Sequence, residues 1–164
     1  MIFVPLGTQK FPHDRLLRMM DGYAENGLIK DDIFAQIGNA RYTPRHFEYI
    51  RFLDRSAFEE QICRADLVVT HGGVGIIISA LAMDKPVVAM PRLQKYGEHV
   101  DDHQLEIAMV FEENGYLFCC RDGDDLLSLI QKSRTHKFAK YVSRSGRIQE
   151  IVTSYLENLE EQRR

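Results

Sequence analysis

A glycine-rich turn between an apolar run and a helix start is the part of this sequence best suited to chemistry. His71, Gly72, Gly73 and Gly75 follow the apolar run 66–70 and precede the apolar segment 76–83. Glycines after a strand let the backbone approach a phosphate closely, and the N–H groups of the following helix then point at the anion. The turn therefore predicts an anion site, first of all for a nucleotide, with an ordinary tight turn as the alternative.

Two other loops carry polar residues behind apolar runs. The first holds Gly7, Thr8 and Gln9, whose hydroxyl and amide groups can donate hydrogen bonds to a phosphate or a sugar. The second is the segment 91–104, a polar stretch too long for a routine connection, which contains Arg92, Lys95, Tyr96, Glu98, His99, His103 and Gln104. Together these loops favour a nucleotide pocket.

Several common chemistries lose support. The glycine turn lacks GxGxxG spacing and no Walker lysine follows it, which argues against an NAD oxidoreductase and a P-loop NTPase. His99 and His103 are four residues apart, but no HExxH core or cysteine pair completes a zinc site, so we predict no metal and no cofactor. For His71 three interpretations stay open: a general base, a phosphate donor or a rim histidine.

The elements that must position these loops alternate between strands and helices. We expect strands at 2–5, 33–37, 47–52, 66–70, 86–90 and 116–119, and helices at 13–27, 55–64, 74–83, 101–114 and 124–133. This alternation implies right-handed crossovers and a mainly parallel sheet with both faces covered. The prediction is one doubly wound α/β domain over 1–164, with the loops after strands one, four and five on one rim.

A long helix is expected at about 141–162. One stripe of it is apolar and its end is charged, and the stripe could serve core packing or a partner surface.

Composition narrows the setting. The chain has 164 residues and a formal net charge of -3, so it lacks the basic field that dominates nucleic-acid binding, and we expect no nucleic-acid partner. Its 3 cysteines form no CxxC pair, which favours a reducing compartment. Neither a signal peptide nor a run of membrane-spanning length is apparent, so we expect a cytoplasmic chain recruited to membranes only through something else.

Four motifs resemble those of a known family. They are Val4–Thr8, Ala65–Gly75, Lys85–Val88 and Pro91–Gln104, and the last is the most specific. The chain is similar to the nucleotide-sugar-binding C-terminal half of GT-B glycosyltransferases, the glycosyltransferase family 28 C-terminal domain. It most resembles a short form that is a separate small subunit, as in bacterial capsular or exopolysaccharide glycosyltransferases and in the dolichyl-diphosphate N-acetylglucosaminyltransferase.

The resemblance implies a single Rossmann-like domain that binds a UDP-sugar without a metal. It places Gly7, Thr8, Gln9 and the turn Gly72, Gly73, Val74 and Gly75 around the diphosphate, Phe52 and Leu53 against uracil, and His103 and Gln104 near the donor sugar. Arg92, Lys95 and Tyr96 join the substrate-binding set. Ser79 stands where full-length relatives often carry a ribose-binding glutamate, so ribose recognition should differ here.

The resemblance also implies partners, because a GT-B enzyme works in a cleft between two domains. We expect a membrane-anchored subunit that binds the acceptor, a lipid-linked sugar acceptor, and peripheral location at the inner face of the membrane; the isolated chain could form a homo-oligomer. Candidates for the catalytic base within this chain are His71, Glu98 and His99. The alternatives are a non-catalytic nucleotide-sugar-binding regulatory or scaffold subunit, and a stand-alone enzyme such as a UDP-sugar epimerase built from two copies.

Overall fold

The computed structural model describes residues 1–142 and 153. The long helix predicted at about 141–162 therefore falls outside the described residues apart from 141, 142 and 153, and its apolar stripe stays a prediction.

The centre of the molecule is a six-stranded sheet in the order β3-β2-β1-β4-β5-β6. Its strands are β1 (Ile2–Pro5), β2 (Ile33–Gln36), β3 (Glu48–Ile50), β4 (Leu67–Thr70), β5 (Val87–Ala89) and β6 (Phe118–Cys119). All the pairings are parallel. The predicted fold class is thus confirmed.

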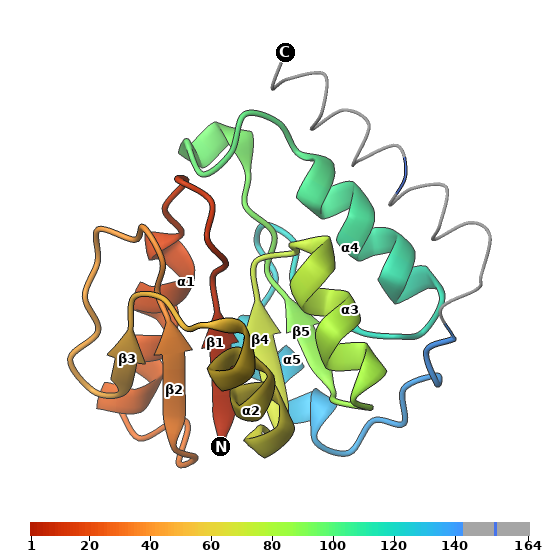
Figure 1. Ribbon diagram of the computed structural model, residues 1–164, viewed down its shortest axis with the longest axis horizontal. Coiled ribbons are helices and arrows are strands. Elements are labelled where there is room, and N and C mark those ends of the chain that lie inside the picture. The colour runs from red at the N-terminus through yellow and green to blue at the C-terminus, as the bar shows by residue number, and fades with distance from the viewer. Residues whose placement is uncertain (143–152, 154–164) are drawn as a thin grey trace.

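Helices connect the strands and cover both faces of the sheet. They are α1 (Asp14–Glu25), α2 (Arg55–Arg64), α3 (Val74–Ala82), α4 (His103–Glu113) and α5 (Leu126–Ser133), with a short 3-10 helix, η1 (Gln94–Tyr96), in the loop after β5. Figure 1 shows α2, α3 and α4 in front of the sheet and α1 and α5 behind it. None of the helices in the described part of the chain combines the length and the apolar character that crossing a bilayer requires.

Alternate residues of each central strand enter two different cores. In β4, Val69 packs with α1 and α5, whereas Val68 packs with α2, α3 and α4. In β1, Val4 belongs to the same core as Val69, and Phe3 belongs to the same core as Val68. Side chains alternate across a strand, so a sheet with two covered faces needs continuous apolar runs, and this is why β1, β4 and β5 read as such runs in the sequence.

The outer strand β3 differs from the expectation. The segment 47–52 was expected to alternate as an ordinary strand, but β3 is only three residues long and all three are exposed. It pairs on one side only, with β2, and lies at the edge of the sheet. Tyr49 and Ile50 remain 42% and 41% exposed. Their residue types therefore reflect the preference of aromatic and β-branched residues for strands, and not burial.

Helix α4 begins two residues later than expected, at His103. Asp101 accepts a hydrogen bond from the N–H of His103, as a capping residue would, at 3.1 Å. Asp102 occupies the N-cap position, but its carboxylate accepts from the N–H of Gln94 at 2.8 Å. It therefore ties the loop that contains η1 to the start of α4.

Candidate nucleotide site at the carboxyl ends of the strands

The chain reverses its winding direction between β1 and β4. From β1 the sheet grows towards β2 and β3 on one side, and from β4 towards β5 and β6 on the other. In open α/β sheets ligands bind at such a switch point, outside the carboxyl ends of the strands. The loops there are 6–9 after β1 and 71–75 after β4, and loop 91–104 follows β5; we call them together the rim site. They lie at the upper end of Figure 1.

The packing of His71 explains why residues 7 and 73 are glycines. Its imidazole lies between Gly7 and Gly73: a Cβ on Gly7 would be 2.9 Å from Cε1 of His71, and a Cβ on Gly73 would be equally close to Cε1 and closer still to Nε2. Real Cβ atoms essentially never come so near. Glycine at both positions therefore makes room for a histidine, and the turn is not a generic one.

His71 is neutral at physiological pH. It is only 4% exposed, and burial followed by the charge of Arg92 holds its pKa well below the usual value. Its Nδ1 lies 3.3 Å from the carbonyl oxygen of Pro5, which accepts a hydrogen bond from the hydroxyl of Thr70 at 2.7 Å. An Nδ1–H directed at Pro5 leaves Nε2 as an acceptor.

The N-terminus of α3 suits an anion. Gly73 is its N-cap, and among the described residues no side chain caps it and no acidic residue lies in its first turn. Gly75 is exposed, and a Cβ there would meet no atom within 4 Å. The free N–H groups and the positive end of the helix dipole therefore meet an open surface, as an anion site requires.

Ser79 lies one turn along α3 from Gly75 and thus on the same face. Its hydroxyl donates to the carbonyl oxygen of Gly75 at 2.8 Å. The hydroxyl proton of Ser79 is thereby used within the helix. The hydroxyl oxygen can still accept a hydrogen bond, so a ligand could bind it only by donating one.

Loop 91–104 closes over the glycine turn. Gly72 has a φ of +77°, and a Cβ on it would lie 3.1 Å from the carbonyl oxygen of Gln104. Gln104 is fully buried and its Oε1 faces the N–H of Arg92 at 3.3 Å. Arg92 is 1% exposed, and its Nη2 donates to the carbonyl oxygen of Leu6 at 2.7 Å. Arg92 thus ties loop 91–104 to the loop after β1, and Gln104 lies against Gly72 of the glycine turn.

Glu98, a candidate base, is held by an ion pair and by a backbone hydrogen bond. It is 5% exposed, and Arg15 of α1 donates to both its oxygens, Nε to Oε1 at 3.0 Å and Nη2 to Oε2 at 2.8 Å. Its Oε2 also accepts from the N–H of Leu93 at 3.1 Å. The fully buried His13 lies 3.7 Å away. This geometry fits a carboxylate that fixes loop 91–104 better than one that takes up a substrate proton.

Arg15 and His13 were not picked out from the sequence. Arg15 looks like an ordinary surface residue of an amphipathic helix, and only its reach across 83 positions to Glu98 reveals its role. Burial, followed by the charge of Arg92, keeps the pKa of His13 well below normal, so this histidine is neutral as well.

The other predicted residues of loop 91–104 lie in two places. His99 is 7% exposed, with Nδ1 3.0 Å from Oδ1 of Asp101. His103, at the first position of α4, faces Glu106 at 3.0 Å, and this hydrogen bond raises its pKa. Lys95 and Tyr96 both bind the carboxylate of Asp122, in the loop between β6 and α5, and so anchor η1.

The loops after β2 and β3 complete the rim. Gly38 has a φ of +54° and touches the first loop, since a Cβ on it would lie 2.5 Å from the carbonyl oxygen of Gly7. Asn39, which the sequence did not single out, donates to the carbonyl oxygen of Gln9 at 3.0 Å. Phe52 is 45% exposed beside Gly38, and the N–H of Leu53 donates to Gln36. An exposed aromatic ring is thus available at this end of the rim.

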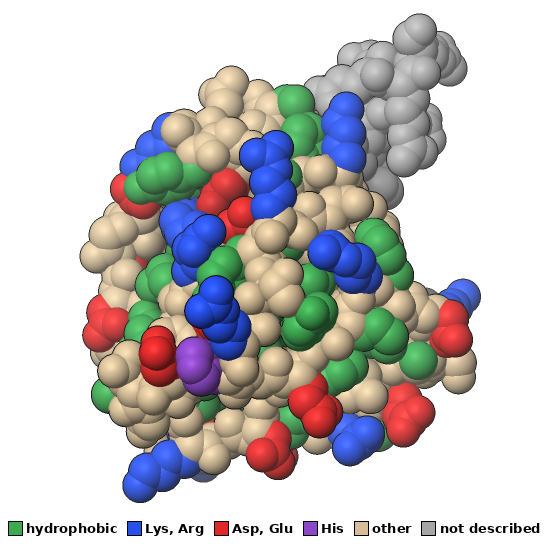
Figure 2. All heavy atoms as spheres, turned by 90° about the vertical axis from the view of Figure 1, so that its left-hand side faces the viewer, with side chains coloured by type: hydrophobic (Ala, Val, Ile, Leu, Met, Phe, Trp, Pro, Cys, Tyr) green, Lys and Arg blue, Asp and Glu red, His purple; other side chains and the backbone are tan. Residues whose placement is uncertain are grey.

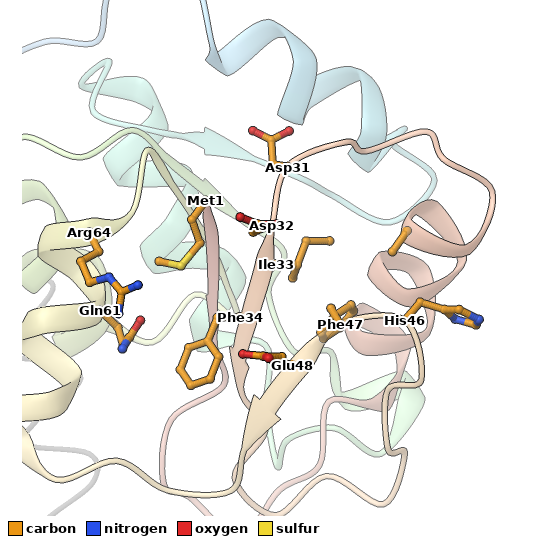
Figure 3. A pocket seen from close by; sticks show the side chains of 11 residues that line it. Met1, Asp31, Asp32, Ile33, Phe34, His46, Phe47, Glu48, Gln61 and Arg64 are labelled. Carbon is orange, nitrogen blue, oxygen red and sulfur yellow. The ribbon is translucent and has the colours of Figure 1, made fainter.

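A cavity of about 770 Å³ lies at the opposite end of the strands. Figure 3 shows Phe34 of β2, Glu48 of β3, and Gln61 and Arg64 of α2 around it. It has no glycine turn and no helix N-terminus directed into it, so we do not assign the nucleotide to it. A second cavity, of about 850 Å³, lies beside the rim site.

The described residues contain no group of three or more His, Cys, Asp and Glu side chains that could hold a metal ion. His99 precedes α4, so it does not share a helical face with His103. The residues at hand therefore do not fit a metal site of the kind that the four-residue spacing suggested.

A parallel sheet wound in both directions, with a glycine turn and an uncapped helix at its switch point, defines the Rossmann-like class of ligand-binding α/β domains. Within this class the family is clear. Residues 1–159 match the model of the glycosyltransferase family 28 C-terminal domain, and the chain belongs to that family.

Curated relatives support the same assignment. The chain is 31% identical over 130 residues to the UDP-N-acetylglucosamine transferase subunit ALG13 of Homo sapiens, covering 73% of this chain and 11% of that protein. It is 31% identical over 78 residues to the subunit of the same name from Saccharomyces cerevisiae, covering 47% of this chain and 37% of that one. The chain thus spans well under half the length of these relatives.

Solved structures agree on the fold. An NMR structure of ALG13 superposes with a TM-score of 0.58 and 17% identity, over 92% of this chain and 93% of that chain. The glycosyltransferase of kitacinnamycin gives 0.61 and 16% identity, over 98% of this chain but 39% of that chain. The similarity to the larger enzyme covers only part of it.

Proposed function

We propose that this chain is the donor-binding subunit of a UDP-sugar glycosyltransferase that acts on a lipid-linked acceptor, in capsular or exopolysaccharide biosynthesis. The observation that carries the proposal is the uncapped N-terminus of α3 behind the His71–Gly73 turn, in a chain of the glycosyltransferase family 28 C-terminal domain. N–H groups fixed at that terminus stabilise the negative charge that develops on the leaving UDP diphosphate.

We propose the following roles for the rim residues. The diphosphate lies against Gly72, Gly73 and Gly75, with Thr8 and Gln9 on its other side, and Phe52 stacks on uracil. His71 is the remaining base candidate beside His99, because it is neutral and its Nε2 is an acceptor. Arg92, Glu98 and Gln104 shape the loop that surrounds the donor sugar.

A membrane-anchored partner subunit supplies the acceptor half. A glycosyltransferase with a similar fold is longer than this chain, which covers 39% of the kitacinnamycin enzyme. A partner at the inner face of the membrane would complete the cleft and bring the acceptor hydroxyl to the donor sugar.

Calorimetric titration with UDP tests the donor site directly. We expect saturable binding by the wild-type chain, and no heat up to millimolar UDP would refute the proposal. Replacing Phe52 by alanine should weaken UDP binding by about fivefold to tenfold, the usual value of one aromatic stacking contact. Binding of inorganic diphosphate should be unchanged. The control is Tyr49→Ala, since Tyr49 is a similarly exposed aromatic residue on β3 itself.

A non-catalytic donor-binding or scaffold subunit is the second candidate. It is favoured by the burial of His71, Glu98 and His99, which are 4%, 5% and 7% exposed. Transferase activity of the reconstituted pair decides between the two. If His71→Gln and His99→Gln both keep full activity while the pair assembles, catalysis belongs to the partner.

A further inference from the structure

The cavity of about 850 Å³ beside the rim site is lined by an unusual set of charges. It lies between α1, the loop residues 10–12, Arg41 in the loop after β2, and residues 96–98 at and after the end of η1. We call it the basic groove. Four cationic side chains line it, and only two acidic ones: Lys10, Arg15, Arg18 and Arg41 against Asp14 and Glu98.

Both carboxylates of the basic groove have hydrogen-bond partners within the protein. Glu98 is held by Arg15 in the two-pronged ion pair described above. Asp14 accepts hydrogen bonds from the backbone N–H groups of Arg41 and Tyr42, at 2.8 Å and 3.1 Å. Both bonds to Asp14 go to Oδ1, so its negative charge remains, but cationic side chains still outnumber acidic ones in the lining of the groove.

Three cations of the groove have no acidic partner among the described residues. Arg18 lies over the ring of Tyr42 at 4.3 Å and Lys10 lies 5.6 Å from the ring of Phe11, but neither they nor Arg41 form an ion pair there. All three are exposed. Figure 2 looks onto the side of the molecule formed by α1 and β3 and shows Lys and Arg side chains gathered on its upper half. The upper half is the end that carries the rim site.

The groove is also partly apolar. Phe11, Pro12, Met19 and Tyr96 line it together with the cations, and Tyr96 is 50% exposed. Such a surface suits an amphiphile with a phosphate group next to a hydrocarbon chain: the cations bind the phosphate, and the apolar side chains cover the first carbons. A free sugar carries no charge for the cations to bind, and a nucleobase could stack on the aromatic rings but would leave the cations unused.

The groove adjoins the rim site through two loops, the one after β1 and loop 91–104, which contributes Tyr96 and Glu98 to the groove. Residues 7–9 belong to the rim site and 10–12 to the groove, so a ligand in the groove lies next to the donor. We propose that the basic groove binds the phosphate-bearing head of the lipid-linked acceptor, with its phosphates against Lys10, Arg18 and Arg41 and its first hydrocarbon units against Phe11 and Tyr96. The choice of the acceptor as the lipid rests on the proposed function.

Farnesyl diphosphate is a soluble probe of this chemistry. With the full chain saturated by UDP, an NMR titration should shift backbone amides of residues 10–19 and 95–98, while UDP itself shifts those of residues 7–9 and 71–79. Inorganic diphosphate lacks the chain and farnesol lacks the charge, so both should bind more weakly. Shifts by farnesyl diphosphate confined to 71–79, or no shifts, would overturn the proposal.

A pair of matched variants tests the cations. Arg18→Gln combined with Arg41→Gln should weaken farnesyl diphosphate binding by about tenfold to a hundredfold, as two charge-assisted contacts are lost. Lys30→Gln combined with Arg55→Gln removes the same charge at two exposed positions outside the groove and should change little. Equal affinity of the two double variants would refute the assignment.

Two further measurements are needed. One distinguishes a lipid-linked acceptor from an ordinary phospholipid as the ligand of the groove, and the other distinguishes failure of the groove proposal from failure of the donor-site proposal. Dihexanoyl phosphatidylglycerol, below its micelle concentration, should bind more weakly than farnesyl diphosphate; equal affinity would make the groove a contact for ordinary phospholipid and overturn the acceptor assignment. UDP binding is read in the same samples. Absence of UDP binding, with farnesyl diphosphate still shifting the groove residues, would count against the donor site alone. UDP binding without farnesyl diphosphate shifts in the groove would count against the groove alone.

Discussion

The packing of His71 between two glycines makes a sharp prediction about Gly73. Its backbone has φ -69° and ψ 120°, a conformation that alanine adopts freely, so Gly73→Ala introduces no backbone strain of its own. The added methyl group would overlap the imidazole of His71. The ring has little room to move, because His71 is buried and its Cε1 also lies close to Gly7.

The expected cost follows from these contacts. Overpacking a buried site usually costs about 1–3 kcal/mol. Against this, the lower entropy of an unfolded chain with alanine in place of glycine stabilises by about 0.4–1 kcal/mol. We therefore expect Gly73→Ala to lower the free energy of unfolding by roughly 1–2 kcal/mol. Urea denaturation followed by circular dichroism measures it.

Gly75→Ala is the matched control. It adds the same methyl group two residues further on, in the first turn of α3, where it meets nothing within 4 Å, and it should be neutral or stabilising. A second control removes the obstacle: in a His71→Ala background the Gly73→Ala change should cost nothing, which a double-mutant cycle reveals. Equal stabilities of the two alanine variants, or a cost that persists without His71, would refute the packing argument.

Three other outcomes are expected. Arg15→Ala leaves its buried carboxylate partner uncompensated and should cost about 2–4 kcal/mol in urea denaturation, with Arg15→Lys milder; equal effects would contradict a role for the two-pronged geometry. His13 and His71 have lowered pKa values in the folded chain, so the unfolded chain takes up protons first and stability should fall as pH drops below about 6.5, by up to about 1.4 kcal/mol per pH unit for each histidine. His103, whose pKa is raised, works in the opposite direction, and a stability that is flat between pH 7.5 and 5.5 would speak against two buried neutral histidines. Cys63 is exposed whereas burial raises the pKa of the other two thiols to about 12 and about 11, so Ellman's reagent should modify one thiol quickly and two only on unfolding.

The order of elements could be predicted from the sequence because it depends on local patterns. Continuous apolar runs such as 67–70 mark strands covered on both faces, and the spacing of Leu16, Leu17 and Met20 marks a helix with one buried face. Helix α2 was predicted with its observed bounds, 55–64. The exposed edge strand β3 was harder, because exposure depends on what lies beside a strand and not on its residues.

The position of the rim site was also predictable, since the winding of a parallel sheet brings the loops after β1, β4 and β5 to one edge. The roles of its side chains were not. Glu98 looked like a possible base until Arg15, 83 residues away, proved to occupy both of its oxygens. The exposed cations of the basic groove come from separate segments, α1, the loop before it and the loop after β2, and no spacing in the sequence marks them as neighbours.

The glycine turn shows which features the sequence determines and which the tertiary structure determines. By itself the sequence determined that Gly72, Gly73 and Gly75 stand between a buried strand and a helix, because strand, turn and helix are local. Only the tertiary structure decided what each glycine does: Gly73 makes room for His71, Gly72 passes under loop 91–104, and Gly75 keeps the end of α3 open. Those functions depend on atoms brought together by folding, which residue spacing alone does not specify.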